Sequence, residues 1–186
     1  MDDGRTGNFT SLVGFKSNSL LTEFTIDDAE LIIKGRQHRF KYRAKNIVGW
    51  GPYSDDAFVL AARVPDRSER PYFLTFASST LSIVIPRCLD NGGAPIKFYE
   101  LWVDAGDNYT SEFRQLTNYT DNALIYQATQ IKDGLLPGRT YRFISRTRNS
   151  VGYSEYSIYS YIAFGDVPTP PGIPVRILST ETSIKV

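Results

Sequence analysis

The sequence of 186 residues contains a single cysteine, Cys88, and a single histidine, His38. One cysteine excludes a disulfide within the chain and any zinc site that needs several cysteines. One histidine disfavours metal sites with several imidazoles, and no nucleophile and orienting acid stand at a recognisable spacing from it. We therefore expect a non-enzymatic chain with no catalytic residue, no metal site and no cofactor. His38 is expected to be a structural residue at a corner or on the surface, and Cys88 an inert, half-buried thiol.

Excess charge of one sign and long apolar runs are also missing. Lys plus Arg number 21 and Asp plus Glu number 20, which gives a formal net charge of +1. A chain with this balance is not expected to bind nucleic acid, and it lacks the excess charge of a disordered tail. No apolar run approaches the roughly 20 residues of a membrane helix, and residues 1–8 lack the basic start and apolar core of a signal peptide. The acidic clusters at 2–3 and 27–30 lack the ligand spacing of a calcium loop and are expected to be solvated turns.

What the sequence does contain is an internal repeat, which governs the interpretation of its length. Three pairs of segments match at the same offset of 103 positions: 35–40 with 138–143, 46–49 with 149–152, and 64–65 with 167–168. Weaker matches extend the repeat on both sides, from 1–4 with 103–106 to 82–85 with 183–186. We therefore expect three domains: 1–64 with only the later strands, 65–167 complete, and 168–186 with the first strands of a third. On this interpretation it is doubtful that Met1 and Val186 are natural termini.

The local signal within the complete repeat is β throughout. Along 141–148, apolar or small side chains alternate with arginines except at Ile144, and this period of two is typical of a strand with one buried face. Asp90-Asn91-Gly92-Gly93 has the composition of a turn, because Asn and Gly accept positive φ angles. The other expected strands are 81–85, 96–103, 124–131 and 159–164. About seven short strands in about 100 residues, without helical periodicity, predict an antiparallel two-sheet sandwich.

Several short motifs in this frame carry a family resemblance. Leu135, Pro137-Gly138 and Tyr141 precede a corner formed by Asn149, Gly152, Ser154 and Ser157, and a Pro-rich join follows at 167–171. The loop 91–96 followed by Tyr99 fits the same pattern. The combination resembles a fibronectin type III domain and covers essentially all of the chain. The resemblance implies an all-β fold of tandem antiparallel immunoglobulin-like β-sandwiches with fibronectin type III topology.

The resemblance also sets specific expectations for single residues. It implies that Tyr141 hydrogen-bonds backbone at the corner between the fifth and sixth strands. His38 replaces that tyrosine in the first repeat and either substitutes through a ring nitrogen or leaves a looser corner. Ile85 stands where the family usually has a tryptophan, so the core must be filled differently. No Arg-Gly-Asp is present, and integrin-type adhesion is not supported.

Two sets of side chains are candidates for partner binding. The first is a basic stripe at alternate positions of the expected sixth strand: Arg39, Lys41, Arg43 and Lys45, then Arg142, Arg146 and Arg148. Its charge would attract an acidic protein surface, an anionic glycan or acidic tails. The alternative is ordinary cross-strand pairing with Glu100 and Asp104. The second set is aromatic and would serve as contact anchors or as packing against a neighbouring domain: Trp50, Tyr53, Tyr153 and Tyr156.

Three sequons for N-glycosylation begin at Asn8, Asn108 and Asn118, and two of them fall in nearly equivalent places of the repeat. They favour an extracellular or cell-surface location, with a ciliary or cytoskeletal location as the alternative.

The expected function is therefore that of a structural or adhesive module. The chain would be a stiff spacer and a protein- or glycan-binding surface in a tandem array, with other proteins or neighbouring fibronectin type III domains as partners. Prolines in the join 64–71 would limit flexing. The alternatives are an intracellular scaffold whose basic stripes meet acidic tubulin tails, and an accessory region of a larger enzyme or receptor such as a receptor phosphatase. Head-to-tail assembly through the segment 168–186 is a further hypothesis, which the missing third strand of the first repeat weakens.

Overall fold

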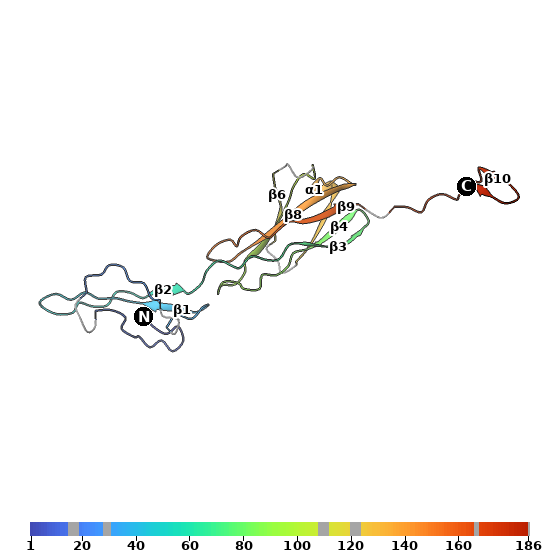
Figure 1. Ribbon diagram of the computed structural model, residues 1–186. Helices are drawn as coiled ribbons and strands as arrows, with labels where there is room; N and C mark the ends of the chain where they lie inside the picture. Colours follow the sequence, from blue (N-terminus) through green and yellow to red (C-terminus); the bar gives the residue numbers. More distant parts are fainter. Residues whose placement is uncertain (15–18, 28–30, 108–111, 120–123, 166–167, 186) are drawn as a thin grey trace.

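The computed structural model describes residues 1–14, 19–27, 31–107, 112–119, 124–165 and 168–185. The first repeat, a central sandwich and the C-terminal tail follow one another along the molecule (Figure 1). The elements in chain order are β1 (Gln37–Phe40), β2 (Ala57–Leu60), β3 (Tyr72–Ala77), β4 (Thr80–Val84), β5 (Phe98–Val103), β6 (Arg114–Tyr119), β7 (Ile125–Thr129), α1 (Gln130–Asp133), β8 (Arg139–Arg148), β9 (Ser160–Phe164), β10 (Leu178–Ser179) and β11 (Ile184–Lys185).

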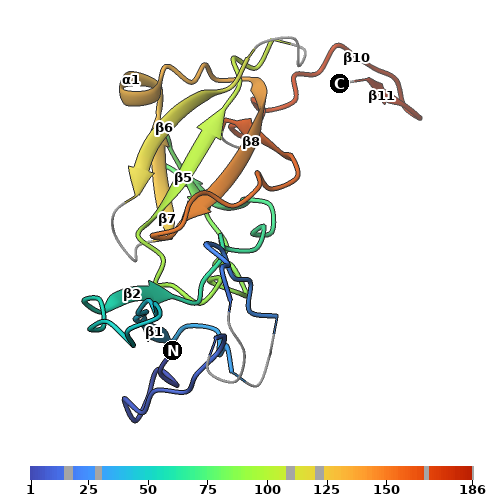
Figure 2. The same cartoon turned by 90° about the vertical axis from the view of Figure 1, so that its left-hand side faces the viewer.

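The central part is a sandwich of two antiparallel sheets. One sheet has the order β3-β4-β7 and the other β6-β5-β8-β9, so strands that follow each other in sequence change sheet between β4 and β5 and again on either side of β7. Figure 2 shows β6, β5 and β8 side by side, with β8 the longest strand. The predicted all-β fold class is confirmed.

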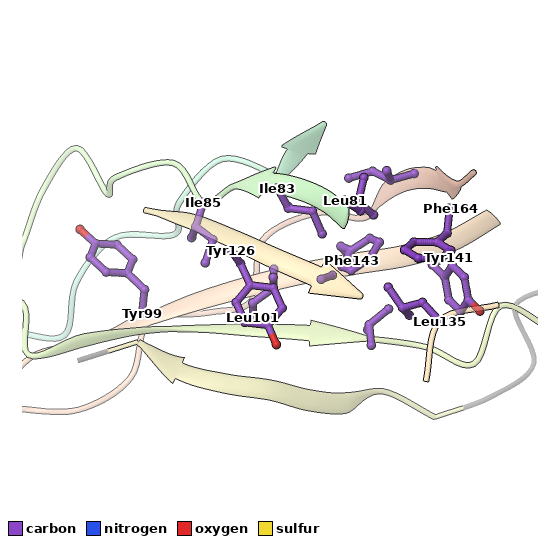
Figure 3. Packing of buried hydrophobic residues seen from close by; sticks show 13 residues of the cluster. Leu81, Ile83, Ile85, Tyr99, Leu101, Tyr126, Leu135, Tyr141, Phe143 and Phe164 are labelled. Atoms are coloured by element: carbon purple, nitrogen blue, oxygen red, sulfur yellow. The ribbon is translucent and has the colours of Figure 1, made fainter. Parts of the chain in front are cut away.

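The core of the sandwich comes from alternate residues of the facing strands, as a period of two requires. Leu81 and Ile83 of β4 meet Leu101 of β5 and Phe143 of β8 between the sheets (Figure 3). Ile85 is fully buried in the same cluster, so this β-branched side chain occupies the core position where the resemblance suggests a tryptophan. Aromatic neighbours supply much of the remaining volume: Tyr99, Tyr126, Tyr141 and Phe164.

The tyrosine corner of the central sandwich forms as expected. The Tyr141 hydroxyl accepts a hydrogen bond from the backbone N–H of Leu136 at 2.7 Å. Gly106 packs on the tyrosine ring with a φ of 65 degrees, and a Cβ there would lie 2.7 Å from a ring carbon, so only glycine fits. Its counterpart in the first repeat, Gly4, has a φ of 66 degrees.

His38 takes a different role from its counterpart. It is buried, with 1% of its surface exposed, so the surface alternative is wrong. Its Nδ1 lies 3.1 Å from the carbonyl oxygen of Asp2. A ring nitrogen therefore does contact backbone, but on the chain segment next to β1 rather than at the corner that the tyrosine ties.

One predicted strand ends earlier than expected. The run 124–131 forms β7 only as far as Thr129, after which the chain enters the single turn α1. The Thr129 hydroxyl accepts from the N–H of Lys132 at 3.1 Å, and Gly134 closes the turn with a φ of 65 degrees. These caps stabilise a helical turn that no periodicity of 3.6 residues indicates, because the segment is too short to show one.

The two outer parts of the chain contain small sheets. In the first repeat β1 pairs with β2, and Val59 on β2 is 52% exposed, whereas its counterpart Ile162 in the sandwich is 4% exposed. The tail forms the hairpin β10-β11. Among the described residues no helix has both the length and the apolar character to cross a membrane.

Candidate functional site

The outer face of the four-stranded sheet carries the predicted basic stripe. Along β8 the side chains of Tyr141 and Phe143 enter the core. The alternate positions therefore face outward, and they hold Arg142, Ile144 and Arg146. Aromatic side chains from neighbouring segments lie between these arginines. We call this set the ladder face: Phe98, Trp102, Phe113, Arg142, Ile144, Arg146, Arg148, Tyr153, Tyr156 and Tyr159.

Guanidinium groups and aromatic rings alternate along the ladder face. The Arg146 Cζ atom lies 4.0 Å from the ring centroid of Tyr153 and 4.7 Å from that of Tyr156. Arg148 stacks on Tyr153 at 4.7 Å and on Phe98 at 5.6 Å. A cation within about 6 Å of a ring centroid is attracted by the negative face of the ring. The predicted stripe and the predicted aromatic anchors are therefore one interleaved structure.

Two of these arginines are also paired with buried carboxylates. The Arg142 Nε lies 2.7 Å from Asp104 Oδ2, and the hydrogen bond raises the pKa of the guanidinium. The Arg146 Nε lies 2.6 Å from Glu100 Oε2, which also accepts from the indole N–H of Trp102 at 3.1 Å. The cross-strand pairing is thus present. Because their charges are balanced within the sheet, Arg142 and Arg146 attract a distant anion less than a free stripe would.

The first repeat builds the same arrangement. Arg39 Nε lies 2.7 Å from Asp2 Oδ2, and its Cζ lies 5.1 Å from the ring centroid of Phe9. Arg142 repeats both contacts, at 2.7 Å with Asp104 and 5.1 Å with Phe113. Asp2 is buried by this pair, so the expectation of a solvated turn is wrong for it.

The remaining cations of the first repeat also lie on aromatic rings. The Lys41 Nζ is 3.9 Å from the ring centroid of Phe9 and 4.9 Å from that of Tyr53. Arg43 stacks on both Trp50 and Tyr53 at 4.5 Å, and the Lys45 Nζ is 5.4 Å from Trp50. We call the ladder face of the sandwich the second ladder, and the first-repeat set the first ladder: Phe9, Arg39, Lys41, Arg43, Lys45, Trp50 and Tyr53. Five aromatic members of the two ladders were not predicted from the sequence, because they lie on other strands or loops: Phe9, Phe98, Trp102, Phe113 and Tyr159.

A cavity of about 560 Å³ opens on the ladder face of the central sandwich. Phe113 and Tyr159 stack with 5.7 Å between ring centroids on one side, while Trp102 and Tyr156 meet edge to face at 5.9 Å on another. Ile144 lies among them and is almost fully covered. The other lining residues are Arg67, Ser157 and Ile158.

A second cluster joins the first repeat to the sandwich. The side-chain amide of Asn149 donates to the carbonyl of Arg63 at 2.7 Å and to that of Asn91 at 2.9 Å. Its Oδ1 accepts the N–H groups of Val151 and Gly152 at 2.8 and 3.1 Å. Asn149 is 1% exposed. One side chain therefore fixes its own corner, the loop 90–93 and the connecting segment.

The loop 90–93 supplies the other half of this joint. The Asp90 carboxylate forms ion pairs with Lys34 of the first repeat and, at 3.0 Å, with Arg63 of the connection. The hydrogen bond from Lys34 holds the pKa of the Asp90 carboxyl below its ordinary value of 3.8. Gly92 has no side chain, and a Cβ at this position would lie 2.1 Å from the carbonyl oxygen of Arg63. Its φ of 74 degrees also favours glycine.

The other predicted sites have separate locations. Asn8 is exposed, Asn108 lies outside the described residues, and Asn118 lies in β6 with its side chain outside the description. Cys88 is half-buried, and burial raises the pKa of its thiol. Among the described residues no three His, Cys, Asp or Glu side chains gather in a group that could hold a metal ion.

The sequence is similar to that of a curated protein of known name. No family model matches the chain. The chain is 33% identical over 135 residues to a protein named as the receptor-type tyrosine-protein phosphatase mosPTP-1 of Aedes aegypti. The match covers 70% of this chain and 10% of the relative, so the chain spans about a tenth of that protein's length.

Solved structures extend the comparison to the fold. A crystal structure of titin domains matches 67% of this chain and 39% of that chain at 18% identity, with a TM-score of 0.50. The solution structure of a fourth FNIII domain from human matches 61% of this chain and 90% of the domain at 22% identity, with a TM-score of 0.49. The titin likeness, at 18% identity, concerns the fold alone.

Proposed function

We propose that this chain, whose central sandwich has the fibronectin type III fold, is a non-catalytic spacer and binding region of a larger extracellular or cell-surface protein. In this proposal 65–167 is one complete domain, 1–64 holds the later strands of the domain before it, and 168–186 holds the first strands of the domain after it. The receptor-type relative, with a length about ten times that of the matched part, supports placement in a multidomain receptor.

The observation that carries the spacer role is the joint around 61–66. Backbone bonds link the connection to the loop of the next domain, from Arg63 N–H to the Gly92 oxygen at 2.8 Å and from Asp66 N–H to the Asp90 oxygen at 2.9 Å. Asn149 and the ion pairs of Asp90 add side-chain bonds across the same place. A linker held on both sides resists the bending that a free Gly- or Ser-rich linker would permit.

The binding role is proposed for the two ladder faces. Their aromatic rings are held by stacked cations and therefore lose little conformational entropy when a partner packs on them. Trp50, Tyr53, Tyr153 and Tyr156 remain exposed at the sheet surface in spite of these contacts. Partner proteins, rather than distant polyanions, suit a face whose arginines are partly neutralised.

Small-angle X-ray scattering and NMR relaxation of the full chain test the spacer role. In the natural chain we expect the first repeat and the central sandwich to tumble with one correlation time. A double variant, Asp90→Ala with Asn149→Ala, should give two correlation times and a broader distribution of dimensions.

The matched control is Asp66→Ala with Asn46→Ala. Asp66 pairs with the same Arg63, at 2.5 Å, but does not reach the first repeat, and Asn46 makes the equivalent corner without the joint bonds. The control should tumble like the natural chain. Independent tumbling of the two parts in the natural chain would rule out a stiff spacer.

The proposed location has its own test. Peptide mass spectrometry of the natural protein should find N-glycans at the exposed Asn8. Unmodified Asn8, Asn108 and Asn118 throughout would favour the intracellular scaffold instead.

A further inference from the structure

The two ladders differ at one of the alternate positions that carry their cations, and we call that position a rung. Lys41 stands between Arg39 and Arg43 in the first repeat, whereas the counterpart between Arg142 and Arg146 is Ile144. The first ladder therefore has a cation at every alternate position from 39 to 45, and the second lacks one at 144. The cavity of about 560 Å³ lies at this missing rung.

The aromatic surroundings of the missing rung are retained. In the first repeat the Lys41 ammonium lies 3.9 Å from the ring of Phe9 and 4.9 Å from that of Tyr53. Their counterparts in the sandwich, Phe113 and Tyr156, both line the cavity. Phe113 stacks with Arg142 and Tyr156 with Arg146, as their counterparts in the first repeat stack with the flanking arginines. What differs is the middle position, where the sandwich has Ile144 instead of an ammonium group.

The wall is also richer in aromatic surface than its counterpart. Tyr159 occupies the place of Asp56, which in the first repeat lies 3.4 Å from Arg39. Tyr159 stacks on Phe113 with an interplanar angle of 8 degrees, so two parallel rings form one side. Trp102 closes another side, and Trp has the strongest attraction for cations among the aromatic side chains.

Charge around the cavity does not oppose a cation. Each guanidinium near it has a carboxylate partner among the described residues: Arg67 with Glu155 at 2.5 Å, Arg142 with Asp104 at 2.7 Å, and Arg146 with Glu100 at 2.6 Å. Lys41 shows within this same chain that an ammonium group is accommodated between two stacked arginines.

We infer that the cavity over Ile144 receives a lysine side chain of a partner protein, which completes the second ladder as Lys41 completes the first. This inference rests on the proposed role of the ladder face as a protein-binding surface and specifies what that surface recognises. The methylene groups of the lysine would pack on Trp102 and Tyr159, and the ammonium group would lie against Phe113 and Tyr156.

NMR titration of the full chain with Nα-acetyl-lysine methylamide, which keeps the side-chain ammonium group, tests the inference. The indole N–H of Trp102 should shift and saturate, while that of Trp50 should not, because Lys41 already fills its ladder. Nα-acetyl-norleucine methylamide has the same four-carbon chain without the terminal ammonium group and should bind about tenfold more weakly, as the loss of one cation–π contact implies. Equal affinity of the two probes would overturn the inference and make the cavity an apolar site.

Two variants locate the binding. Ile144→Lys copies the first ladder and should abolish the shift of Trp102. Because Ile144 is nearly buried, Phe113→Leu provides a milder second variant that keeps the apolar bulk. It should weaken the lysine probe several-fold and leave the norleucine probe unchanged. Lysine binding that survives either variant unaltered would overturn the inference.

The reciprocal change is Lys41→Ile, which should open a second site and bring the backbone amides of Phe9 and Tyr53 into the titration. Failure of the lysine probe to bind the natural chain would refute the lysine site alone. The spacer role would still stand or fall on the scattering and relaxation measurements.

Discussion

Replacement of Asn149 by alanine tests whether the joint stabilises the sandwich. Its side chain makes four hydrogen bonds, two within its own corner and two to the carbonyl groups of Arg63 and Asn91. Asn149→Ala removes all four bonds and leaves the partly buried backbone groups without these partners. The substitution changes no charge and removes little apolar surface, so the effect reports hydrogen bonding.

The magnitude follows from the number and burial of these bonds. A typical hydrogen bond contributes about 0.5–1.5 kcal/mol net, and the contribution is smaller where the partner is exposed. Four bonds from a buried side chain to partly exposed backbone therefore predict a loss of about 2–4 kcal/mol. This is a large part of the roughly 5–15 kcal/mol by which a domain is stable.

Asn46 is the matched control. Its Oδ1 accepts from Val48 N–H at 2.9 Å and Gly49 N–H at 3.1 Å, as in the second repeat. The side chain is exposed and makes only these two bonds among the described residues. Asn46→Ala should therefore cost at most about 1 kcal/mol.

The assay is urea unfolding of the full chain. In a Trp50→Phe background the remaining tryptophan, Trp102, reports on the central sandwich. Asn149→Ala should lower the midpoint without changing the slope, and Asn46→Ala should barely move it. Equal effects of the two substitutions would refute the reasoning, because the joint bonds would then contribute nothing.

Three further predictions concern single groups. Tyr141→Phe should cost about 1–3 kcal/mol in the same unfolding assay, because the N–H of Leu136 loses its acceptor; a loss within error would show that water replaces the hydroxyl. The Asp90 carboxyl should titrate below 3.8 in an NMR experiment, and Lys34→Ala should move its pKa upward. Its contribution to stability is complete above pH 3.8 and is lost as the pH falls through the lower pKa of the folded chain, so an unshifted titration would contradict the joint. The Cys88 thiol should react with a thiol reagent with a pH midpoint above 9.0, and a midpoint below 9.0 would indicate an activated thiol.

Patterns between near neighbours predicted much of the sandwich. Alternation along 141–148 anticipated β8, and Gly92 and Gly93 have the positive φ angles expected of their turn. Tyr141 ties its corner as the resemblance implied. The turn α1 was not predicted, because two capping residues rather than a periodic pattern determine it.

The candidate sites were predicted only in part. The arginines of the stripe and the exposed tyrosines were identified separately, and the carboxylate partners of Arg142 and Arg146 were named as an alternative. Their interleaving was not foreseen. The rings of Phe113 and Trp102 come from other segments, and nothing near them in sequence marks them as ladder members.

The sequence by itself determined the repeat, the alternation of buried and exposed positions, and the glycines that its turns need. These properties depend on residues a few positions apart, whose relation the backbone geometry fixes. Only the tertiary structure decided that Asn149 holds Arg63, 86 residues away, and that Ile144 lies at the floor of an aromatic cavity. Such contacts depend on the register between strands and on the seating of one sheet against another, which the packing of the whole core sets.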